Sequence, residues 1–210
     1  MKIILIGPPG SGKGTQAARL HDRFAIPHLS SGEILRSEVA AGTDLGILIN
    51  GYMKKGEIGP AELITEVVLA YIDAHCPDGF ILDGFPRTVY QAQRLDARHR
   101  LDAAVFISVP ESEIIRRLAS RLVCSRCGAV FHATAKPPRE GGICDHCGSA
   151  LARRMDDNEA TVMNRIRVYR EETVPVLDHY RSSGILRTVE GNGDPDTVFA
   201  CIVSVITPHS

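Results

Sequence analysis

Short apolar runs alternate along the chain with longer stretches that carry apolar residues at helical spacing. Each run is apolar on both faces, which is typical of a strand buried inside a parallel sheet. The runs span residues 3–6, 26–29, 79–82, 103–109 and 184–189. Because helical patterns fill the intervals between them, the chain predicts an α/β fold: a mostly parallel sheet flanked by helices.

A few capping, glycine and proline residues indicate where these helices begin and end. A first helix is expected over 13–24, and Ser30 or Ser31 can cap a second helix that runs towards residue 41. Pro60 is expected in the first turn of a later helix, where proline is tolerated. A long helix is predicted over 159–181, with Pro175 bending it. Glycines punctuate the helical pattern at positions 42, 51 and 56.

The segment 122–157 departs from this alternation. It has no helical period, and it contains several glycines, adjacent prolines at 137 and 138, and four cysteines. We therefore expect a small inserted domain at 122–157, a helical insert at 30–59, and a core domain formed by 1–29, 60–121 and 158–210.

The composition is that of an ordinary globular protein. The chain has 210 residues, of which 44% are hydrophobic and 23% charged, and its formal net charge is −1. This balance gives no overall attraction to nucleic acid or to acidic membranes. The apolar run at the N-terminus is too short for a secretion signal, and no apolar stretch approaches a membrane span. We expect a cytoplasmic protein.

A glycine-rich loop follows the first strand and opens the first helix, with the sequence GPPGSGKGT over residues 7–15. Glycines let backbone N–H groups point at phosphate oxygens, and the helix N-terminus favours negative charge. Lys13 supplies a positive charge for the β- and γ-phosphates. Gly14 stands where serine or threonine usually follows the lysine, and the hydroxyl comes one residue later, at Thr15. The phosphate-binding residues are expected to be Gly10, Ser11, Gly12, Lys13, Gly14 and Thr15.

Two Cys-x-x-Cys pairs lie in the inserted segment, and their spacing is typical of a zinc ribbon. The four cysteines are Cys124, Cys127, Cys144 and Cys147. Four thiolates complete a tetrahedral shell and leave no position for a catalytic water, so the metal is expected to be structural. Iron or cobalt can also occupy such a site. Disulfides are the alternative to a metal, and His132 and His146 are near enough to compete as ligands. Cys76 and Cys201 stand alone and are expected to be small apolar fillers.

Two further motifs resemble those of adenylate kinases, within the nucleoside monophosphate kinase family. The run SSGEILR at 30–36 is similar to the acceptor-binding segment of these enzymes, and DGFPRT at 83–88, followed by Gln91, is similar to their DGFPRT signature. The resemblance extends from residue 1 to about 206. It implies a magnesium-dependent monomer that transfers a phosphoryl group from ATP to AMP and reversibly forms two ADP. It also implies that 30–59 is an AMP-binding segment and 122–157 a zinc-binding lid of the kind many bacterial adenylate kinases have.

The resemblance assigns roles to individual residues. The AMP site would comprise Ser31, Arg36, Glu57, Ile58, Gly59, Gly84, Phe85, Pro86, Arg87, Gln91, Arg154 and Arg165. The ATP site would comprise the loop residues 10–15 together with Arg117, Arg121, Val130, Phe131 and Gly193. Asp83 would hold waters of the magnesium shell. The catalytic residues would be Lys13, Arg87, Arg121, Arg154 and Arg165, with Asp156 and Asp157 tying the lid to its arginines.

The chemistry of phosphoryl transfer favours such a set independently. The reaction passes through a loose transition state, so the protein mainly positions and neutralises charge. A planar guanidinium offers two parallel donors to phosphate oxygens, which lysine cannot. An enzyme of this class therefore needs arginines on several elements and no dedicated protein base.

Departures from the family pattern concern affinity rather than reaction class. Serine replaces a common threonine at 31, glycine a common valine at 59, tyrosine a frequent proline at 90, and leucine a common arginine at 122. Base choice rests on few contacts, so a kinase for another nucleoside monophosphate, or one that uses GTP as donor, remains an alternative.

A second alternative is a nucleotide-gated module whose zinc ribbon contacts nucleic acid. Between the first and last cysteine the charges of Arg126, Lys136, Arg139, Glu140 and Asp145 sum to +1, and Phe131 is the sole aromatic residue. Nucleic-acid ribbons usually present a basic face with stacking aromatics, which this segment lacks.

Overall fold

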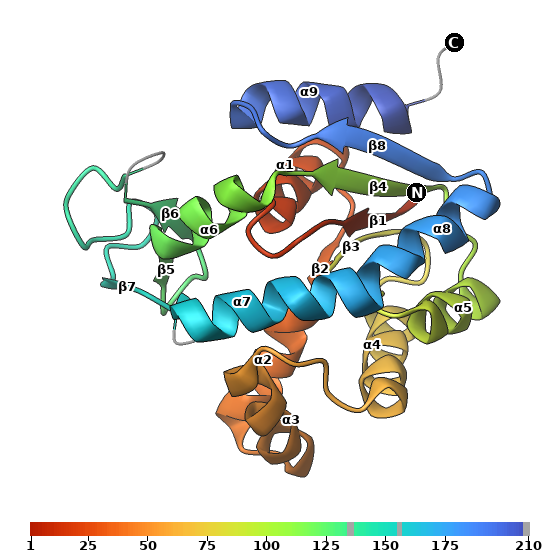
Figure 1. Cartoon of the computed structure of the whole chain (residues 1–210), viewed down its shortest axis with the longest axis horizontal. Coiled ribbons are helices and arrows are strands. Elements are labelled where there is room, and N and C mark those ends of the chain that lie inside the picture. Colours follow the sequence, from red (N-terminus) through yellow and green to blue (C-terminus); the bar gives the residue numbers. More distant parts are fainter. Residues whose placement is uncertain (134–136, 155–156, 208–210) are drawn as a thin grey trace.

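A central parallel sheet, flanked by helices on both faces, organises the chain (Figure 1). The structure is a computed structural model that describes residues 1–133, 137–154 and 157–207. The described strands of this sheet lie in the order β2-β3-β1-β4-β8, and every neighbouring pair is parallel. Their bounds are β1 (Lys2–Ile6), β2 (His28–Ser30), β3 (Phe80–Asp83), β4 (Ala103–Ser108) and β8 (Leu186–Glu190). The predicted α/β fold is confirmed.

Helices connect the strands and cover both faces of the sheet. Their bounds are α1 (Lys13–Phe24), α2 (Ser31–Ala41), α3 (Asp44–Lys55), α4 (Ala61–His75), α5 (Val89–Arg98), α6 (Glu111–Ala119), α7 (Glu159–Val168), α8 (Val174–Ser182) and α9 (Pro195–Ile206). A π-helical segment, η2 (Tyr169–Thr173), joins α7 to α8. No helix among the described residues is long and apolar enough to cross a membrane.

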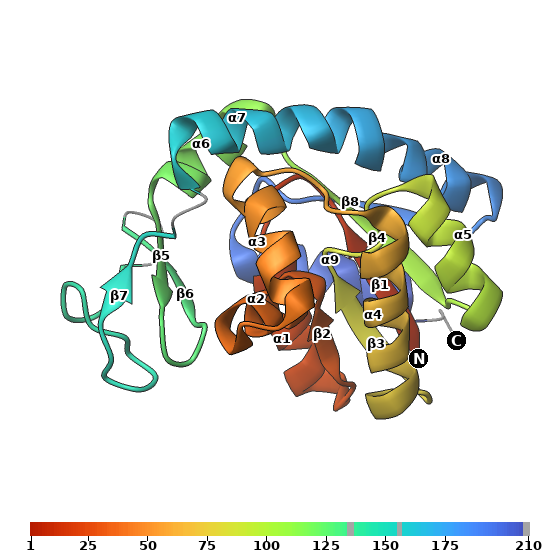
Figure 2. The same ribbon diagram turned by 90° about the horizontal axis from the view of Figure 1, so that it is seen from below.

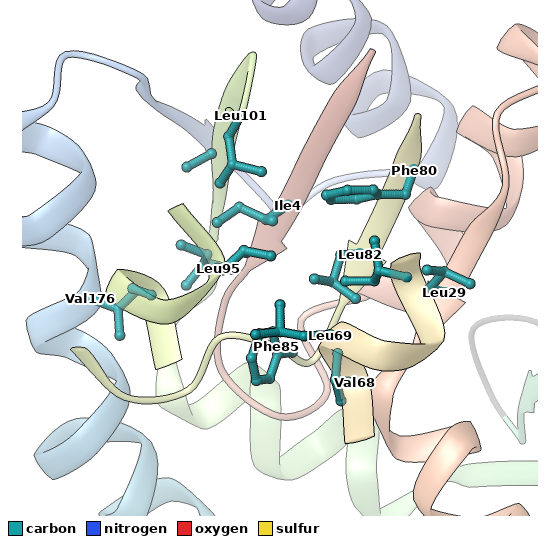
Figure 3. Close-up of a cluster of buried hydrophobic side chains, with 14 of the residues drawn as sticks. Ile4, Leu29, Val68, Leu69, Phe80, Leu82, Phe85, Leu95, Leu101 and Val176 are labelled. Carbon is teal, nitrogen blue, oxygen red and sulfur yellow. The ribbon is translucent and has the colours of Figure 1, made fainter. Parts of the chain in front are cut away.

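Alternation along the strands sends successive side chains into two separate cores. Ile4 and Ile6 of β1 pack with residues of α4, α5 and α8, whereas Ile3 and Leu5 pack against α1 and α9. Figure 3 shows the first of these cores, where Ile4, Leu69, Phe80 and Leu82 lie between the sheet and its helices. Burial on both faces explains why the strands are continuous apolar runs in the sequence.

The inserted segment forms a separate small sheet at one end of the molecule (Figure 2). Its antiparallel strands are β5 (Arg121–Cys124), β6 (Val130–His132) and β7 (Leu151–Ala152), in the order β6-β5-β7. Helix α7 begins beside this small sheet, contacts α3, and continues through η2 to α8, which packs against α5 (Figures 1 and 2).

The boundaries of several elements differ from those predicted. Gly51 lies inside α3 and does not interrupt it, because the helix tolerates an isolated glycine at modest cost. Gly42 and Gly56 do end helices, both with positive φ. Pro60 precedes α4 at its N-cap and is not in the first turn. The predicted helix over 159–181 contains η2, and its axis turns between α7 and α8, just before Pro175 (Figures 1 and 2).

Candidate functional site

A large cavity opens at the carboxyl ends of β1 and β3, between the glycine-rich loop, α2 and the small antiparallel sheet. Its volume is about 770 Å³. A smaller cavity of about 80 Å³ adjoins it between α2, α3 and α4. Parallel α/β sheets place their ligand sites at this edge, because the strand ends and the helix N-termini meet there.

The glycine-rich loop lines the large cavity, and its backbone conformation requires glycine at two positions. Gly10 and Gly12 have φ values of +79° and +92°, which side-chain-bearing residues rarely adopt. A Cβ on Gly14 would lie 3.3 Å from an Asp83 carboxylate oxygen. A serine or threonine at position 14 would crowd that carboxylate, which explains why the hydroxyl is displaced to Thr15.

The Lys13 ammonium group lies inside the loop. Its Nζ donates to the carbonyl oxygens of Gly7 and Pro8, at 2.8 and 2.9 Å, and to Ser11 Oγ at 3.3 Å. Burial lowers the pKa of Lys13 from 10.5 to about 8; Asp83 opposes this change, and the nearby Arg87, Arg165 and Arg121 reinforce it. The low pKa therefore reflects loss of solvent first and neighbouring positive charge second, and a bound anion would stabilise the charged ammonium.

Positive charge predominates around the large cavity. Among the residues that the structure describes, the cations lining it are Lys13, Arg36, Arg87, Arg121, Arg126, Arg154 and Arg165, and the carboxylates are Glu33 and Asp83. These cations come from the loop, from α2, from the β3–α5 connection, from the small sheet and from α7. Their convergence from elements far apart in sequence favours a ligand with several phosphate groups.

Asp157 pairs with two of these arginines. Its carboxylate accepts both Nε and a terminal nitrogen of Arg121, the Nε bond at 2.7 Å, and it accepts Arg165 at 3.3 Å. The Asp157 side chain is only 3% exposed, so a buried carboxylate holds two guanidinium groups at the cavity wall. Asp156, which was also expected to link the lid to its arginines, lies outside the described residues.

Arg87 is held through several of its atoms in the loop between β3 and α5. Its backbone N–H donates to Gln91 Oε1 at 2.8 Å, and its Nε donates to the Gly84 carbonyl at 2.8 Å. Because Gln91 uses its oxygen for Arg87, its amide NH₂ is the group that can face the smaller cavity. Gly84 has φ +80°, and a Cβ there would lie 2.8 Å from Ser31 Oγ. The absence of a Cβ at Gly84 thus lets this loop approach α2 closely.

The smaller cavity gathers most of the remaining residues that were expected to bind AMP. Ser31, Glu57, Gly59, Phe85 and Gln91 line it, whereas Ile58 lines both cavities. A Cβ on Gly59 would lie 3.1 Å from Ile64 Cδ1. Ile64 therefore occupies the space beside the glycine, which is a physical reason why the frequent valine is missing at this position.

Four residues expected at the ATP site do not line the large cavity. Arg117 donates to Glu113 at 2.7 Å and to the Gly191 carbonyl at 2.9 Å. Phe131 is 1% exposed and packs with Cys124 and Cys144 in a core of the small sheet, while its neighbour Val130 does line the cavity. Gly193 is exposed in the loop before α9. Ser11 is buried beneath its loop and contributes its Oγ to Lys13.

The four cysteines form a compact sulfur cluster. All four sulfur atoms lie within 4.8 Å of one another, with Cys124 and Cys147 at 3.4 Å and Cys127 and Cys144 at 3.5 Å. A tetrahedral zinc with bonds of about 2.3 Å places its sulfur ligands about 3.8 Å apart, so the cluster fits a metal of that size. Neither His132 nor His146 belongs to a metal-binding group among the described residues.

The two cysteine pairs have the same turn geometry. Gly128 donates its N–H to the Cys124 carbonyl and Gly148 to the Cys144 carbonyl, at 3.0 and 2.9 Å, and both glycines have positive φ. Hydrogen bonds from the Ser149 hydroxyl and N–H lower the pKa of Cys147, whereas burial and hydrogen bonds with the neighbouring sulfurs raise the pKa of Cys127. A thiolate is the form that binds a metal. The donor set therefore suits a structural tetrathiolate site.

Sequence reasoning missed several residues that line these cavities. Tyr169 and Thr173 line the large cavity, and Tyr52 and Ile64 line the smaller one. Burial raises the pKa of Tyr169 to about 12, so its hydroxyl stays protonated. Tyr169 and Thr173 follow Arg165 at steps of four residues, a spacing that places side chains on one helix face. That spacing was the available signal.

Comparisons with known proteins agree with this arrangement. The adenylate kinase family model matches residues 5–185. An adenylate kinase of Clostridium acetobutylicum is 45% identical, over 98% of this chain and 99% of its own length. Relatives from Archaeoglobus fulgidus, at 44%, and Lachnospira eligens, at 42%, are also adenylate kinases, and each covers 98% of this chain. With its glycine-rich loop, arginine-lined cavity and four-cysteine cluster, the chain belongs to the adenylate kinase family and is a nucleoside monophosphate kinase.

Proposed function

We propose that this protein catalyses the reversible reaction of magnesium-bound ATP with AMP to give two ADP. The observation that carries the proposal is the convergence of Lys13 and six arginines from several elements on the large cavity. Such a set can neutralise the charge on two nucleotides at once, whereas a hydrolase or a binding module would have less use for it.

The triphosphate of ATP would lie on the glycine-rich loop, with its β- and γ-phosphates at Lys13. The AMP phosphate would lie between Arg36 and Arg87, and the adenine of AMP would enter the smaller cavity beside Gln91. Arg121, Arg154 and Arg165 would contact the transferred group and stabilise the charge on its equatorial oxygens. The acceptor phosphate is already anionic at neutral pH, so no protein base is required.

The two metals would have different roles. Asp83, which lines the cavity beside Gly14, would hold magnesium through water, and the ion would neutralise charge on the ATP phosphates. Zinc would bind the four cysteine sulfurs and cross-link the segment 122–157, which acts as a lid. The lid has a small apolar core around Phe131, so a metal cross-link is physically apt.

A domain division follows from these roles. The core domain would be 1–29, 60–121 and 158–210, the AMP-binding segment 30–59, and the lid 122–157. Closure of the lid and the AMP-binding segment over the nucleotides would exclude water that would otherwise hydrolyse ATP. Arg117 would then act at the ATP phosphates, and Val130, Phe131 and the backbone near Gly193 at the adenine of ATP.

The direct test measures ADP formed from ATP, AMP and magnesium, with metal analysis of the same sample. Rapid ADP formation and about one zinc per chain would support the proposal. A panel of acceptors (AMP, GMP, CMP and UMP) and donors (ATP and GTP) decides the base. A better rate with another monophosphate would replace AMP as the substrate and retain the reaction class.

The cysteine pair at the first turn of the cluster should control thermal stability. We expect Cys124→Ser combined with Cys127→Ser to abolish metal binding and to lower the melting temperature by at least about 5 °C, since each kcal/mol lost in a chain of this size costs about 2–4 °C. Calorimetry and metal analysis measure both effects. Cys201→Ser, at an exposed position on α9, is the matched control and should change neither. An unaltered melting temperature in the double variant would refute a structural metal.

The pH dependence of ATP capture should report the lysine in the loop. Lys13 is a base whose pKa is lowered to about 8, so its positive charge is present below that pH and is lost as the pH rises through it. We expect kcat/KM for ATP, which reflects the free enzyme, to decline by up to about tenfold per pH unit above 8. Bound phosphates stabilise the ammonium, so kcat should stay level to higher pH. A level kcat/KM up to about pH 9.5 would contradict this role.

A further inference from the structure

A stripe of side chains along α7 and η2 connects the lid to the acceptor loop. Residues 157, 161, 165, 169 and 173 follow one another at steps of four. Asp157 holds Arg121, the first residue of β5 in the small sheet, and Thr161 packs against Gly56 at the end of α3. Arg165, Tyr169 and Thr173 line the large cavity. The segment from residue 157 to residue 173 therefore contacts the small sheet and the AMP-binding segment and lines the large cavity.

The π-helical segment keeps the last member of this stripe on the cavity side. Pro175 has no N–H to donate to the carbonyl of Glu171, and its ring would crowd that carbonyl in a regular α-helix. The wider turn of η2, at Tyr169–Thr173, relieves this conflict. An α-helix has 3.6 residues per turn, so a side chain four residues further on is rotated slightly forward around the helix axis. A π-helical turn contains more than four residues, so there the same step rotates the side chain slightly backward. Thr173 consequently returns to the cavity face, although α7 alone would turn it away.

Thr173 contacts the backbone of the loop that carries Arg87. Its hydroxyl donates to the Arg87 carbonyl oxygen at 2.9 Å, and the residue is only 7% exposed. The N–H of Arg87 is held by Gln91 and its Nε by the Gly84 carbonyl. The bond from Thr173 thus fixes the remaining backbone polar atom of Arg87, and it comes from an element 86 residues away.

We propose that Thr173 is a positioning residue for the acceptor phosphate: its hydroxyl fixes the Arg87 carbonyl and so aims the Arg87 guanidinium at AMP. The proposal rests on the proposed function, in which Arg87 binds the AMP phosphate. Loss of the hydroxyl retains the Arg87 guanidinium and its charge and removes only the hydrogen bond that holds the Arg87 backbone. Bound AMP would itself re-order Arg87, so the cost falls on AMP binding more than on turnover at saturation.

The test substitutes the hydroxyl while retaining the shape of the side chain. Thr173→Val should raise the KM for AMP by roughly tenfold, because the Arg87 carbonyl loses its part-buried hydrogen bond, and it should change kcat by less than about threefold. The KM for ATP should stay within about twofold of wild type. Thr173→Ser, which keeps the hydroxyl, should restore the KM for AMP. Thr65→Val is the control: this buried threonine of α4 donates to the Ala61 carbonyl at 2.5 Å, within its own helix.

A double-mutant cycle shows whether Thr173 acts through Arg87. In an Arg87→Ala background, Thr173→Val should change kcat/KM for AMP by less than about twofold, because there is no guanidinium left to aim. A tenfold loss in both backgrounds, an equal loss for ATP, or an unchanged KM for AMP in the single variant would each overturn the positioning role. If the wild-type protein makes no ADP from ATP and AMP, the proposed function itself fails. A fully active wild type with an unaffected Thr173→Val variant defeats only this inference.

Discussion

Lys13→Ala should lower kcat for ADP formation by at least about 100-fold, while the protein remains folded. The ammonium lies within hydrogen-bonding distance of three oxygen atoms of the glycine-rich loop, and burial has already stripped it of most of its water. A desolvated charge interacts more strongly with developing negative charge than a hydrated one does. The lysine therefore stabilises the transition state more than it would at an exposed site.

Steady-state kinetics with ATP, AMP and magnesium measure this effect, and circular dichroism with a melting curve verifies the fold. Lys13 also bonds to the Gly7 and Pro8 carbonyls, so its removal could loosen the loop. Direct titration with ATP separates the two causes, since a lost loop abolishes binding whereas a lost charge mainly lowers kcat. Lys54→Ala, on the exposed side of α3, is the control and should retain full activity. Turnover within about threefold of wild type in Lys13→Ala would refute the assigned role.

Arg87→Ala should lower kcat/KM for AMP by about 10²- to 10³-fold and leave the KM for ATP within about threefold. Arg87 offers a planar pair of donors that fits a phosphate, and the loop fixes its backbone N–H and its Nε. Arg87→Lys keeps the charge and loses the paired geometry. It should therefore fall between wild type and the alanine variant.

Initial rates at varied AMP and saturating ATP measure the effect. Arg98→Ala, at the end of the α5 helix that follows Arg87, is the control, because Arg98 forms exposed ion pairs with Glu66 and Asp73 that contribute little. An equal loss against both nucleotides would mean that Arg87 supports the fold or both sites, and the assignment to the AMP phosphate would be wrong.

Sequence reasoning reached the fold because the pattern of apolar runs reflects burial directly. Strands apolar on both faces required helices on both sides, and the observed sheet has this form. The boundaries of α1, at Lys13 and Phe24, were also predicted, since the glycine-rich loop and the left-handed Ala25 stop the helix on either side. Gly51 was misassigned because an isolated glycine costs a helix only about 1 kcal/mol, so α3 continues through it, and Pro60 lies one position before the predicted first turn.

The sequence by itself determined the fold class, the phosphate-binding loop and the four-cysteine cluster. The loop and each cysteine pair depend on residues close together in the chain, and the fold class depends on a repeated local pattern of apolar runs. Only the tertiary structure decided which arginines meet at the cavity, that Asp157 clamps Arg121 and Arg165, and that Thr173 supports Arg87. These contacts join residues that are far apart in the chain, and no local pattern encodes them. The π-helical turn involves both levels. The sequence supplies Pro175, which favours a wider turn, and the tertiary structure shows that this turn directs Thr173 to the cavity.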